Sequence, residues 1–199
     1  MNKIDIDKAI QSKMFPGRNI RVSPRGSGKR FTRYNLAELL NDLSFDVGAE
    51  IGVRRGKFSN HLMKCNPRLT LYCIDPWEAY SNKYNIERQA RIYQDAIDNL
   101  KGTKAIVIRK RSMDALTDIA DRSLDFVFID GNHDFDFVVM DVIHWSKKVR
   151  KNGIIMCHDY YPFSDCGVMN AVDSYTRSHN IDPWYVTKEL EPTAYWVNA

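Results

Sequence analysis

Five short apolar runs recur at regular intervals along the chain, and they constrain its fold more than any other feature. Each run is rich in Val, Ile, Leu or Phe and is nearly continuous, whereas a strand with one solvent-facing side would alternate apolar and polar residues. Continuous runs of this length are typical of parallel strands that are buried on both faces. The runs are VGAEI (47–51), LTLYCID (69–75), AIVIR (105–109), LDFVFID (124–130) and GIIMCHD (153–159).

Segments with helical periodicity separate these runs. They cover residues 57–65, 84–102, 112–121 and 134–153, and a further helix is expected over 167–179. We expect Gly102 to end the second helix, Asp134 or Asp136 to cap the start of the fourth, and Gly153 to close the fourth. Alternating strands and helices predict right-handed β-α-β crossovers, and hence a doubly wound α/β sheet with helices on both faces.

The C-terminal part departs from this alternation. PWYVTK (183–188) and TAYWVN (193–198) have the composition of strands and are separated only by the short turn ELEP. Two strands that are so close in sequence can pair only as an antiparallel hairpin. We therefore predict a mostly parallel, seven-stranded sheet that ends in a C-terminal antiparallel hairpin.

Charge is distributed unevenly. The net charge is +4, yet residues 1–33 hold nine Lys or Arg against two Asp. Much of this charge lies in the Gly/Pro/Ser-rich segment 16–35, which we interpret as an irregular arm. We favour a solvated tail or a contact in a homo-oligomer, and a patch for an anionic substrate or nucleic acid is the alternative. NLAELLNDL (35–43) predicts an amphipathic helix over one sheet edge, so we divide the chain into an arm with a covering helix (1–45) and a main domain (46–199).

Composition indicates a folded protein outside the membrane. With 44% hydrophobic and 27% charged residues, the chain can bury a sizeable core. No apolar run approaches the roughly 18 residues of a membrane-spanning helix, and MNKIDIDKAI lacks the apolar region of a signal peptide. The four cysteines show no C-x-x-C spacing, so we expect reduced thiols in a cytoplasmic protein.

The end of the first apolar run has the features of a ligand site, because ligands of open parallel sheets bind at the carboxyl ends of the strands. Gly52 and Gly56 flank the turn that follows this run and would let the backbone approach a ligand closely. The next helix would offer its first N–H groups to an anion. Glu50 would repel a pyrophosphate and attract an amine, because an acid at the mouth of a buried strand needs a partner.

Residues at the ends of the next two predicted strands would bind further parts of the same ligand. Asp75, 23 residues after Gly52, can accept hydrogen bonds from ribose hydroxyls. Trp77 either stacks on the base of the ligand or takes a lid or core position. Ser112 and Met113 stand where an adenine edge would lie, with a helix cap at Ser112 as the alternative. These residues predict an adenosine with an amino-acid-like tail, which describes S-adenosylmethionine.

Three stretches, AEIGVRRG, LYCIDPWE and the segment from FVFIDGNH to CHDYY, resemble the class I S-adenosylmethionine-dependent methyltransferases. More narrowly, they resemble the metal-dependent O-methyltransferases of small molecules, including the macrocin-type sugar enzymes and their uncharacterised relatives. The resemblance spans about residues 46–197 and implies the Rossmann-like methyltransferase fold. It implies that Glu50, Gly52 and Gly56 hold the methionine end of the cofactor, that Asp75 binds the ribose and that Asp130 lies beneath the methyl donor.

The resemblance also implies a reaction centre. Asp130 would bind a divalent metal, His133 matches the general base of some sugar methyltransferases, and His158 and Asp159 match the acidic pair that completes the metal site. Two residues depart from the family pattern: Asn132 stands where many relatives have an aspartate, and His158 replaces the first acid of the pair. Pure oxygen ligation would suit Mg²⁺, whereas a histidine ligand favours Mn²⁺ or another transition metal.

Alternatives remain open from the sequence. His133 can be a helix cap, His158 can satisfy buried backbone, and a metal-independent enzyme results if Asp159 only orients His133. The function predicted is transfer of a methyl group to a hydroxyl of a small-molecule acceptor, without a membrane partner. The rival is a non-catalytic or nucleic-acid-directed S-adenosylmethionine-binding protein that uses the basic arm.

Overall fold

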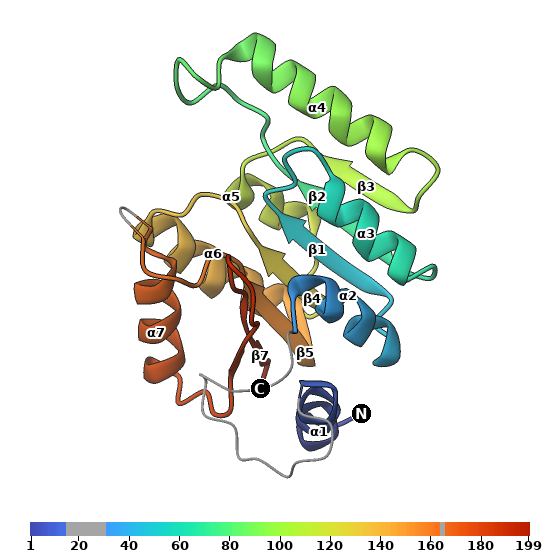
Figure 1. Cartoon of the computed structure of the whole chain (residues 1–199), viewed down its shortest axis with the longest axis vertical. Coiled ribbons are helices and arrows are strands. Elements are labelled where there is room, and N and C mark those ends of the chain that lie inside the picture. Colours follow the sequence, from blue (N-terminus) through green and yellow to red (C-terminus); the bar gives the residue numbers. More distant parts are fainter. Residues whose placement is uncertain (15–30, 164–165) are drawn as a thin grey trace.

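Within residues 1–14, 31–163 and 166–199, which the computed structural model describes, seven strands form one sheet (Figure 1). Their order across the sheet is β3-β2-β1-β4-β5-β7-β6. The strands are β1 Val47–Ile51, β2 Thr70–Ile74, β3 Ala105–Ile108, β4 Leu124–Ile129, β5 Val149–Cys157, β6 Tyr185–Val186 and β7 Ala194–Val197.

The sheet reverses its winding between β1 and β4. The chain builds outward from β1 to β2 and β3, and then returns to add β4 and β5 on the other side of β1. These five strands pair in parallel, whereas β7 pairs antiparallel with both β5 and β6. The predicted doubly wound sheet with a C-terminal hairpin is therefore confirmed. Its switch point, where such sheets bind ligands, lies at the carboxyl ends of β1 and β4.

Helices cover both faces of the sheet (Figure 1). Side chains of α1 to α4 join one apolar cluster, and side chains of α5 to α7 join a second cluster. β4 separates the two, because Phe126 and Phe128 point to the first cluster and Val127 and Ile129 to the second. The helices are α1 Lys3–Met14, α2 Arg33–Asp42, α3 Lys57–Cys65, α4 Ile86–Leu100, α5 Ser112–Ala115, α6 Phe135–Lys148 and α7 Val168–Ser178, and a 3-10 helix, Leu116–Asp118, follows α5.

Helix α1 was not predicted from the sequence. Ile6, Ile10 and Met14 follow one another at four-residue spacing and are buried, so they form the apolar stripe that could have predicted this helix. Tyr185 of β6 donates a hydrogen bond from its hydroxyl to Asp7, which ties α1 to the hairpin. The division of the chain at residue 45 stays a prediction. Most of the basic segment, residues 15–30, lies outside the described residues.

Leu36 and Leu40 of α2 belong to the same apolar cluster as Phe126 of the central strand β4, so this helix packs on one face of the sheet. That it covers a sheet edge stays a prediction. One predicted detail is wrong. Gly153 does not close α6, because α6 ends at Lys148 and Gly153 lies within β5. A Cβ atom on Gly153 would lie 2.4 Å from the Asp125 oxygen, so glycine lets β5 approach β4 where their register shifts.

The cysteines Cys65, Cys73, Cys157 and Cys166 are free thiols. Burial raises the pKa of Cys73 and Cys157, so both are neutral near pH 7. Among the described residues, no helix combines the length and the apolar character that crossing a membrane requires.

Candidate active site

The turn after β1 brings the ends of three strands together. Gly52 has φ +91° and donates from its N–H to the carbonyl of Ile74 at 2.9 Å. A Cβ atom at this position would lie 2.0 Å from the backbone oxygen of Asp130, so only glycine lets the end of β1 lie against the end of β4. Gly56 has φ +68° and is the N-cap of α3. Both predicted glycines therefore shape the turn at the switch point.

Glu50 is an acid held inside the protein at this turn. Its side chain is 2% exposed, and its Oε2 atom is buried without a hydrogen-bond partner. Burial raises the pKa of Glu50 to about 8, and the nearby carboxylates of Asp130 and Asp75 act in the same direction. An unpaired carboxyl oxygen in this position is suited to a ligand amine, as the sequence predicted.

Asp75 organises the loops at the end of β2. One of its oxygens accepts from the N–H groups of Val53 at 3.1 Å and Arg54 at 2.9 Å, and the other accepts from the N–H of Trp77 at 2.8 Å. Trp77 is 2% exposed and donates from Nε1 to the Arg54 carbonyl at 2.7 Å. The structure thus has Trp77 in the core position that the sequence left open beside base stacking. A ribose role for Asp75 stays a prediction, in which its remaining lone pairs would accept hydrogen bonds from the ribose hydroxyls.

Ser112 belongs to a polar group, with Asp141 and Trp145, that was not predicted from the sequence. Its hydroxyl donates to the buried Asp141 of α6 and accepts from Nε1 of Trp145 at 2.8 Å. Arg111, and not Ser112, is the N-cap of α5, so the helix-cap alternative is wrong. Burial raises the pKa of Asp141 to about 6. Met113 packs partly buried on the second apolar cluster, and an adenine contact of Ser112 or Met113 stays a prediction.

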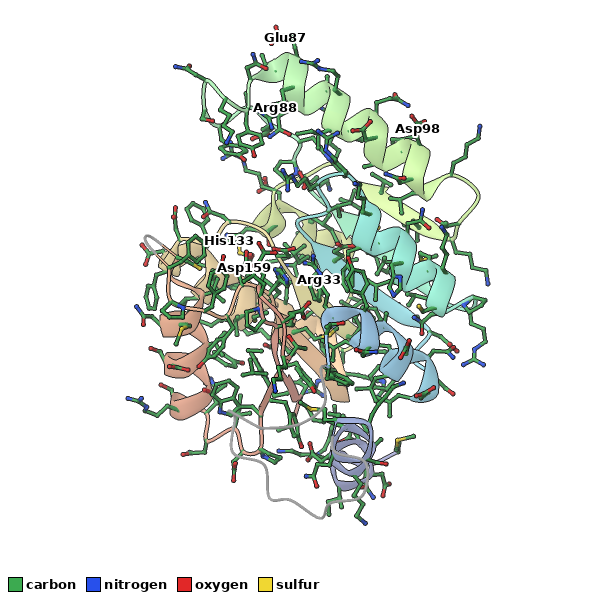
Figure 2. The ribbon with its side chains drawn as sticks, viewed as in Figure 1. Arg33, Glu87, Arg88, Asp98, His133 and Asp159 are labelled. Atoms are coloured by element: carbon green, nitrogen blue, oxygen red, sulfur yellow. The ribbon has the colours of Figure 1, made fainter. Side chains whose placement is uncertain are left out.

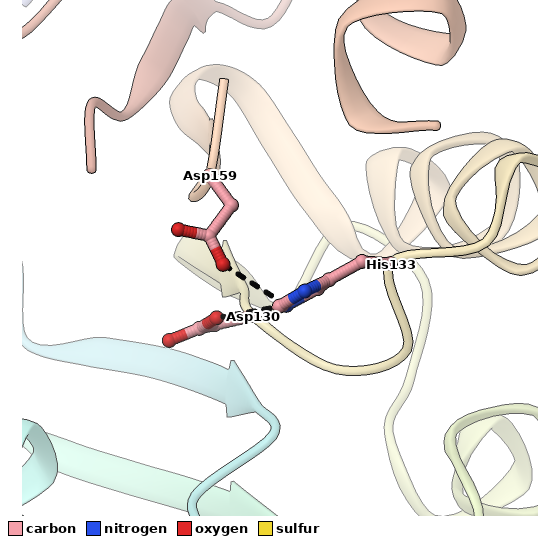
Figure 3. A group of neighbouring side chains, drawn as sticks. All are labelled: Asp130, His133 and Asp159. Atoms are coloured by element: carbon pink, nitrogen blue, oxygen red, sulfur yellow. Dashed lines mark ion pairs between the residues drawn. The ribbon is translucent and has the colours of Figure 1, made fainter. Parts of the chain in front are cut away.

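Asp130, His133 and Asp159 form a close group at the ends of β4 and β5 (Figure 3). The Nε2 atom of His133 lies 3.4 Å from Oδ1 of Asp130 and 3.2 Å from Oδ2 of Asp159. Asp130 raises the pKa of His133 against the cost of burial. Burial opposes the charge on Asp130, but hydrogen bonds to His133 and His158 outweigh it and lower the pKa of this carboxyl. Asp134, and not His133, is the N-cap of α6, so the helix-cap alternative for His133 is wrong.

His158 is buried next to this group, and 4% of its surface is exposed. Its Nδ1 atom is 3.1 Å from Oδ1 of Asp159 and 3.5 Å from Oδ1 of Asp130. Burial disfavours the imidazolium form, but hydrogen bonds to the two carboxylates and their charges together outweigh burial and raise the pKa of His158 to about 9. Arg33 decides against that form, because its Nη1 lies 2.7 Å from Nε2 and a guanidinium only donates, so Nε2 must accept. The ring is therefore neutral, with its proton on Nδ1 toward the carboxylates.

This tautomer bears on the predicted metal site. With Nε2 accepting from Arg33 and Nδ1 protonated, His158 would have to lose one of these contacts before it binds a metal ion, and its role as a ligand stays a prediction. One ligand atom each of Asp130, His133 and Asp159 lies within 4.8 Å of the others, so these three residues form a group that fits a divalent cation. His158 and Asp159 form a second such group with Glu191, from the turn between β6 and β7, which was not predicted from the sequence.

A separate cavity lies away from the Asp130–His133–Asp159 group. It measures about 530 Å³ and is lined by residues of α7, β6 and their connection, among them Asp173, Arg177 and Trp184. Neither Asp130 nor His133 lines it, nor do His158 and Asp159. The reaction centre is therefore not in this cavity but at the strand ends, where these side chains meet.

Comparison with known proteins decides what this site belongs to. The sequence profile of a family described as "Methyltransferase domain" matches residues 49–160, from the residue before Glu50 to the residue after Asp159. The chain belongs to this methyltransferase family. It is a class I S-adenosylmethionine-dependent methyltransferase, and membership in the family implies S-adenosylmethionine as the methyl donor. The matched span contains every residue of the predicted site.

Solved structures show the same fold. The cofactor-bound protein Rv0187 from MTB is 16% identical, with a TM-score of 0.57 over 98% of this methyltransferase and 88% of that chain. A putative caffeoyl-CoA O-methyltransferase from Staphylococcus aureus is 13% identical, with a TM-score of 0.58 over 82% of this chain and 81% of its own. The uncharacterized protein y4gI of Sinorhizobium fredii is 26% identical over 90 residues, which are 44% of this chain and only 10% of that relative.

Proposed function

We propose that this methyltransferase transfers a methyl group from S-adenosylmethionine to a hydroxyl oxygen of a small molecule, such as a sugar or a related metabolite. The observation that carries the proposal is the position of His133, whose Nε2 lies 3.4 Å from Asp130 and 3.2 Å from Asp159 beside the glycine turn. A hydroxyl is a poor nucleophile until its proton leaves, and an imidazole is the side chain best suited to take that proton near neutral pH.

Methyl transfer is an in-line displacement, for which the cofactor supplies an electrophilic methyl group on a sulfonium. The chain must therefore hold donor and acceptor close and aligned. The turn at Gly52 and the acid Glu50 would hold the methionine end. His133 would accept the hydroxyl proton at Nε2. Asp130 and Asp159 would keep its ring in place and stabilise the positive charge that it gains.

A divalent metal fits the same group. Asp130 and Asp159 would hold the ion, and His133 lies within reach of it. Oδ2 of Asp159 and Oδ1 of Asp130 lie 3.2 Å and 3.4 Å from the same Nε2 atom of His133, so both carboxylates present an oxygen to one point. A bound metal would act as a Lewis acid and lower the pKa of the acceptor hydroxyl. If only the carboxylate oxygens bind the ion, the site suits Mg²⁺ or Mn²⁺ and leaves Nε2 of His133 free to accept the proton. If the imidazole binds as well, the site favours Mn²⁺, and His133 is then a ligand and not the base.

Aromatic side chains near the reaction centre support a ring-shaped acceptor. Tyr161 and Phe163 follow Asp159 closely in the chain, and their rings stack with centroids 4.6 Å apart. Phe163 is 41% exposed and His133 is 35% exposed in its side chain, so both can be reached from solvent. Apolar ring faces of this kind bind the C–H faces of sugars and flat metabolites.

The proposal is tested in two steps. Calorimetric titration with S-adenosylhomocysteine, with and without Mn²⁺ or Mg²⁺, should give a dissociation constant on the order of micromolar. Release of S-adenosylhomocysteine is then measured with a panel of sugars and other hydroxyl acceptors, before and after metal removal by a chelator. Lack of cofactor binding would overturn the proposal. Binding without transfer to any hydroxyl would favour the non-catalytic or nucleic-acid-directed alternative.

A further inference from the structure

Arg33 lies at the active site although it precedes the span matched by the family profile, residues 49–160. It is the first residue of α2, and its N–H donates to Oε1 of Glu189 at 2.7 Å. The N–H of Lys188 donates to the carbonyl of Phe31 at 2.6 Å. The turn between β6 and β7 therefore fixes the backbone from which Arg33 reaches the site, and Figure 2 shows Arg33 beside the group of His133 and Asp159.

The two edges of the Arg33 guanidinium differ. Nη1 contacts Nε2 of His158 at 2.7 Å, whereas Nε is buried without a hydrogen-bond partner. The rings of Tyr34 and Phe58 lie 5.6 Å and 5.7 Å from the guanidinium carbon. Among the described residues, no carboxylate pairs with the Arg33 guanidinium: Glu189 accepts from its backbone N–H, and the side chain contacts His158. The edge formed by Nε and Nη2 is thus left without an acceptor.

Such an edge is suited to a carboxylate. A buried, unpaired donor on a cation is costly, because the group has lost water and gained no acceptor. The Nε and Nη2 atoms of an arginine donate in parallel, and they match the two oxygens of a carboxylate. Nη1 can keep its hydrogen bond to His158 while the opposite edge binds the ligand.

Glu50 supplies the complementary charge on the same face of the sheet. Its Oε2 atom is also buried and unpartnered. Phe128 lies beside Glu50 in the register of β4 with β1, and its ring centroid is 4.5 Å from that of Phe58 and 5.8 Å from that of His158. Phe58 and His158 are the same side chains that contact Arg33. An unpaired carboxyl group, which a ligand ammonium would help to ionise, and an unpaired cation therefore face one site, which is the pattern that recognises an amino-acid zwitterion.

We propose that Arg33 binds the α-carboxylate at the methionine end of the cofactor, while Glu50 faces the α-ammonium group. The inference rests on the proposed function, since it requires that this site takes the adenosyl cofactor. It assigns cofactor recognition to a residue of α2, outside the matched family span, and makes the β6–β7 turn a positioning element for the cofactor.

The test compares three ligands by calorimetry: S-adenosylhomocysteine, its decarboxylated analogue, and 5′-methylthioadenosine, which lacks the amino-acid end. The wild type should bind S-adenosylhomocysteine about 10- to 100-fold more tightly than the decarboxylated analogue, as expected for a charge-assisted hydrogen-bonded pair. Arg33→Gln should lose this preference and bind both at the weaker level. Its affinity for 5′-methylthioadenosine should stay unchanged, because that ligand has no carboxylate.

Arg68→Gln is the matched control, because Arg68 pairs with Asp46 just before β1, at the opposite end of the sheet, and should leave all three affinities unchanged. If Arg33→Gln does not fold, Arg33→Lys keeps the charge without the fork and should show a smaller preference than the wild type. Equal binding of the two amine-bearing ligands by the wild type, or an unchanged preference in the variants, would overturn the role of Arg33 alone. A wild type that binds none of the three ligands would overturn the proposed function as well.

Discussion

Two parts of the cofactor site differ in how the chain satisfies its own polar groups. At the end of β2, the Asp75 carboxylate accepts three backbone hydrogen bonds and so has protein partners on both oxygens. Around the ends of β1 and β5, buried polar atoms of Glu50 and of Arg33 from α2 have no hydrogen-bond partner. The first region is complete without a ligand, whereas the second retains binding capacity at a cost in stability.

The two regions therefore have different roles: the first shapes the loops, and the second recognises the ligand. The Asp75 region sets the course of the loops and needs nothing from a cofactor to hold it. In the region of Glu50, Arg33 and the Asp130–His133–Asp159 group, a bound ligand can pair with buried polar atoms that have no partner in the protein. This pairing would stabilise the complex. We therefore expect substitutions in the second region to act mainly on binding and transfer, and substitutions in the first to act mainly on stability.

The largest expected effect is at the reaction centre. His133→Ala should lower the rate of methyl transfer about 100- to 10,000-fold, because the proton acceptor is removed. Asp130→Ala should abolish transfer and also weaken any metal binding, which a separate metal titration would detect. His144→Ala, on α6, which begins two residues after His133, is the control and should keep its rate. Retained turnover in either variant would remove that residue from the mechanism.

The second prediction concerns the free energy of unfolding that is lost by burying the Glu50 carboxylate without a partner. The pKa of Glu50 is about 8 in the folded protein against 4.5 for a free glutamate, so the unfolded chain releases this proton first as pH rises. The ligand-free wild type should therefore lose stability between these two pH values. Glu50→Gln does not titrate, and above pH 8 it should be more stable than the wild type by up to about 4 kcal/mol.

Urea denaturation of ligand-free protein at pH 5 and pH 8.5 measures this difference, and the variant should bind S-adenosylhomocysteine more weakly at both pH values. Glu87→Gln changes an exposed acid on α4 (Figure 2) and should show neither effect. Equal stability of Glu50→Gln and wild type across this range would mean that Glu50 has a partner in the folded protein.

The third effect concerns the turn that both regions share. Gly52 and Gly102 both have positive φ, but an added Cβ would meet the Asp130 backbone at Gly52 and nothing within 4 Å at Gly102. Gly102→Ala should cost about 1 kcal/mol for the left-handed backbone alone. Gly52→Ala should cost about 3 kcal/mol and weaken cofactor binding, because the end of β4 must move. If Gly52→Ala and Gly102→Ala lose the same free energy of unfolding on urea denaturation, the backbone at Gly52 is not in close contact with the end of β4.

The smallest effect tests the completed region. Trp77→Phe removes the hydrogen bond from Nε1 to the Arg54 carbonyl and should cost about 1 kcal/mol more than Trp196→Phe. Trp196 is equally buried, and its Nε1 has no partner, so the pair isolates the hydrogen bond from the loss of ring volume. Affinity for 5′-methylthioadenosine should change little in either variant. A large loss at Trp77 would place its ring in contact with the cofactor after all.

Local patterns predicted most of the fold. The apolar runs became strands and the intervening periodic segments became helices, because burial on both faces and helical spacing are visible within a few residues. Gly153 was misjudged because a glycine after a helical pattern indicates a helix end, and only the neighbouring Asp125 shows that it serves a close strand contact. The stripe of Ile6, Ile10 and Met14 was present in the sequence but lies in a basic stretch that suggested an arm.

The sequence by itself determined which residues stand at the strand ends, because a parallel sheet delivers the residue after each strand to one edge. Asp130 and His133 were therefore predicted together, and Asp159 beside them. Only the tertiary structure decided the state of His158, since its tautomer depends on Arg33, 125 residues away in the chain. Such a contact leaves no mark in local spacing, because it arises from how α2, β5 and the β6–β7 turn pack against one another.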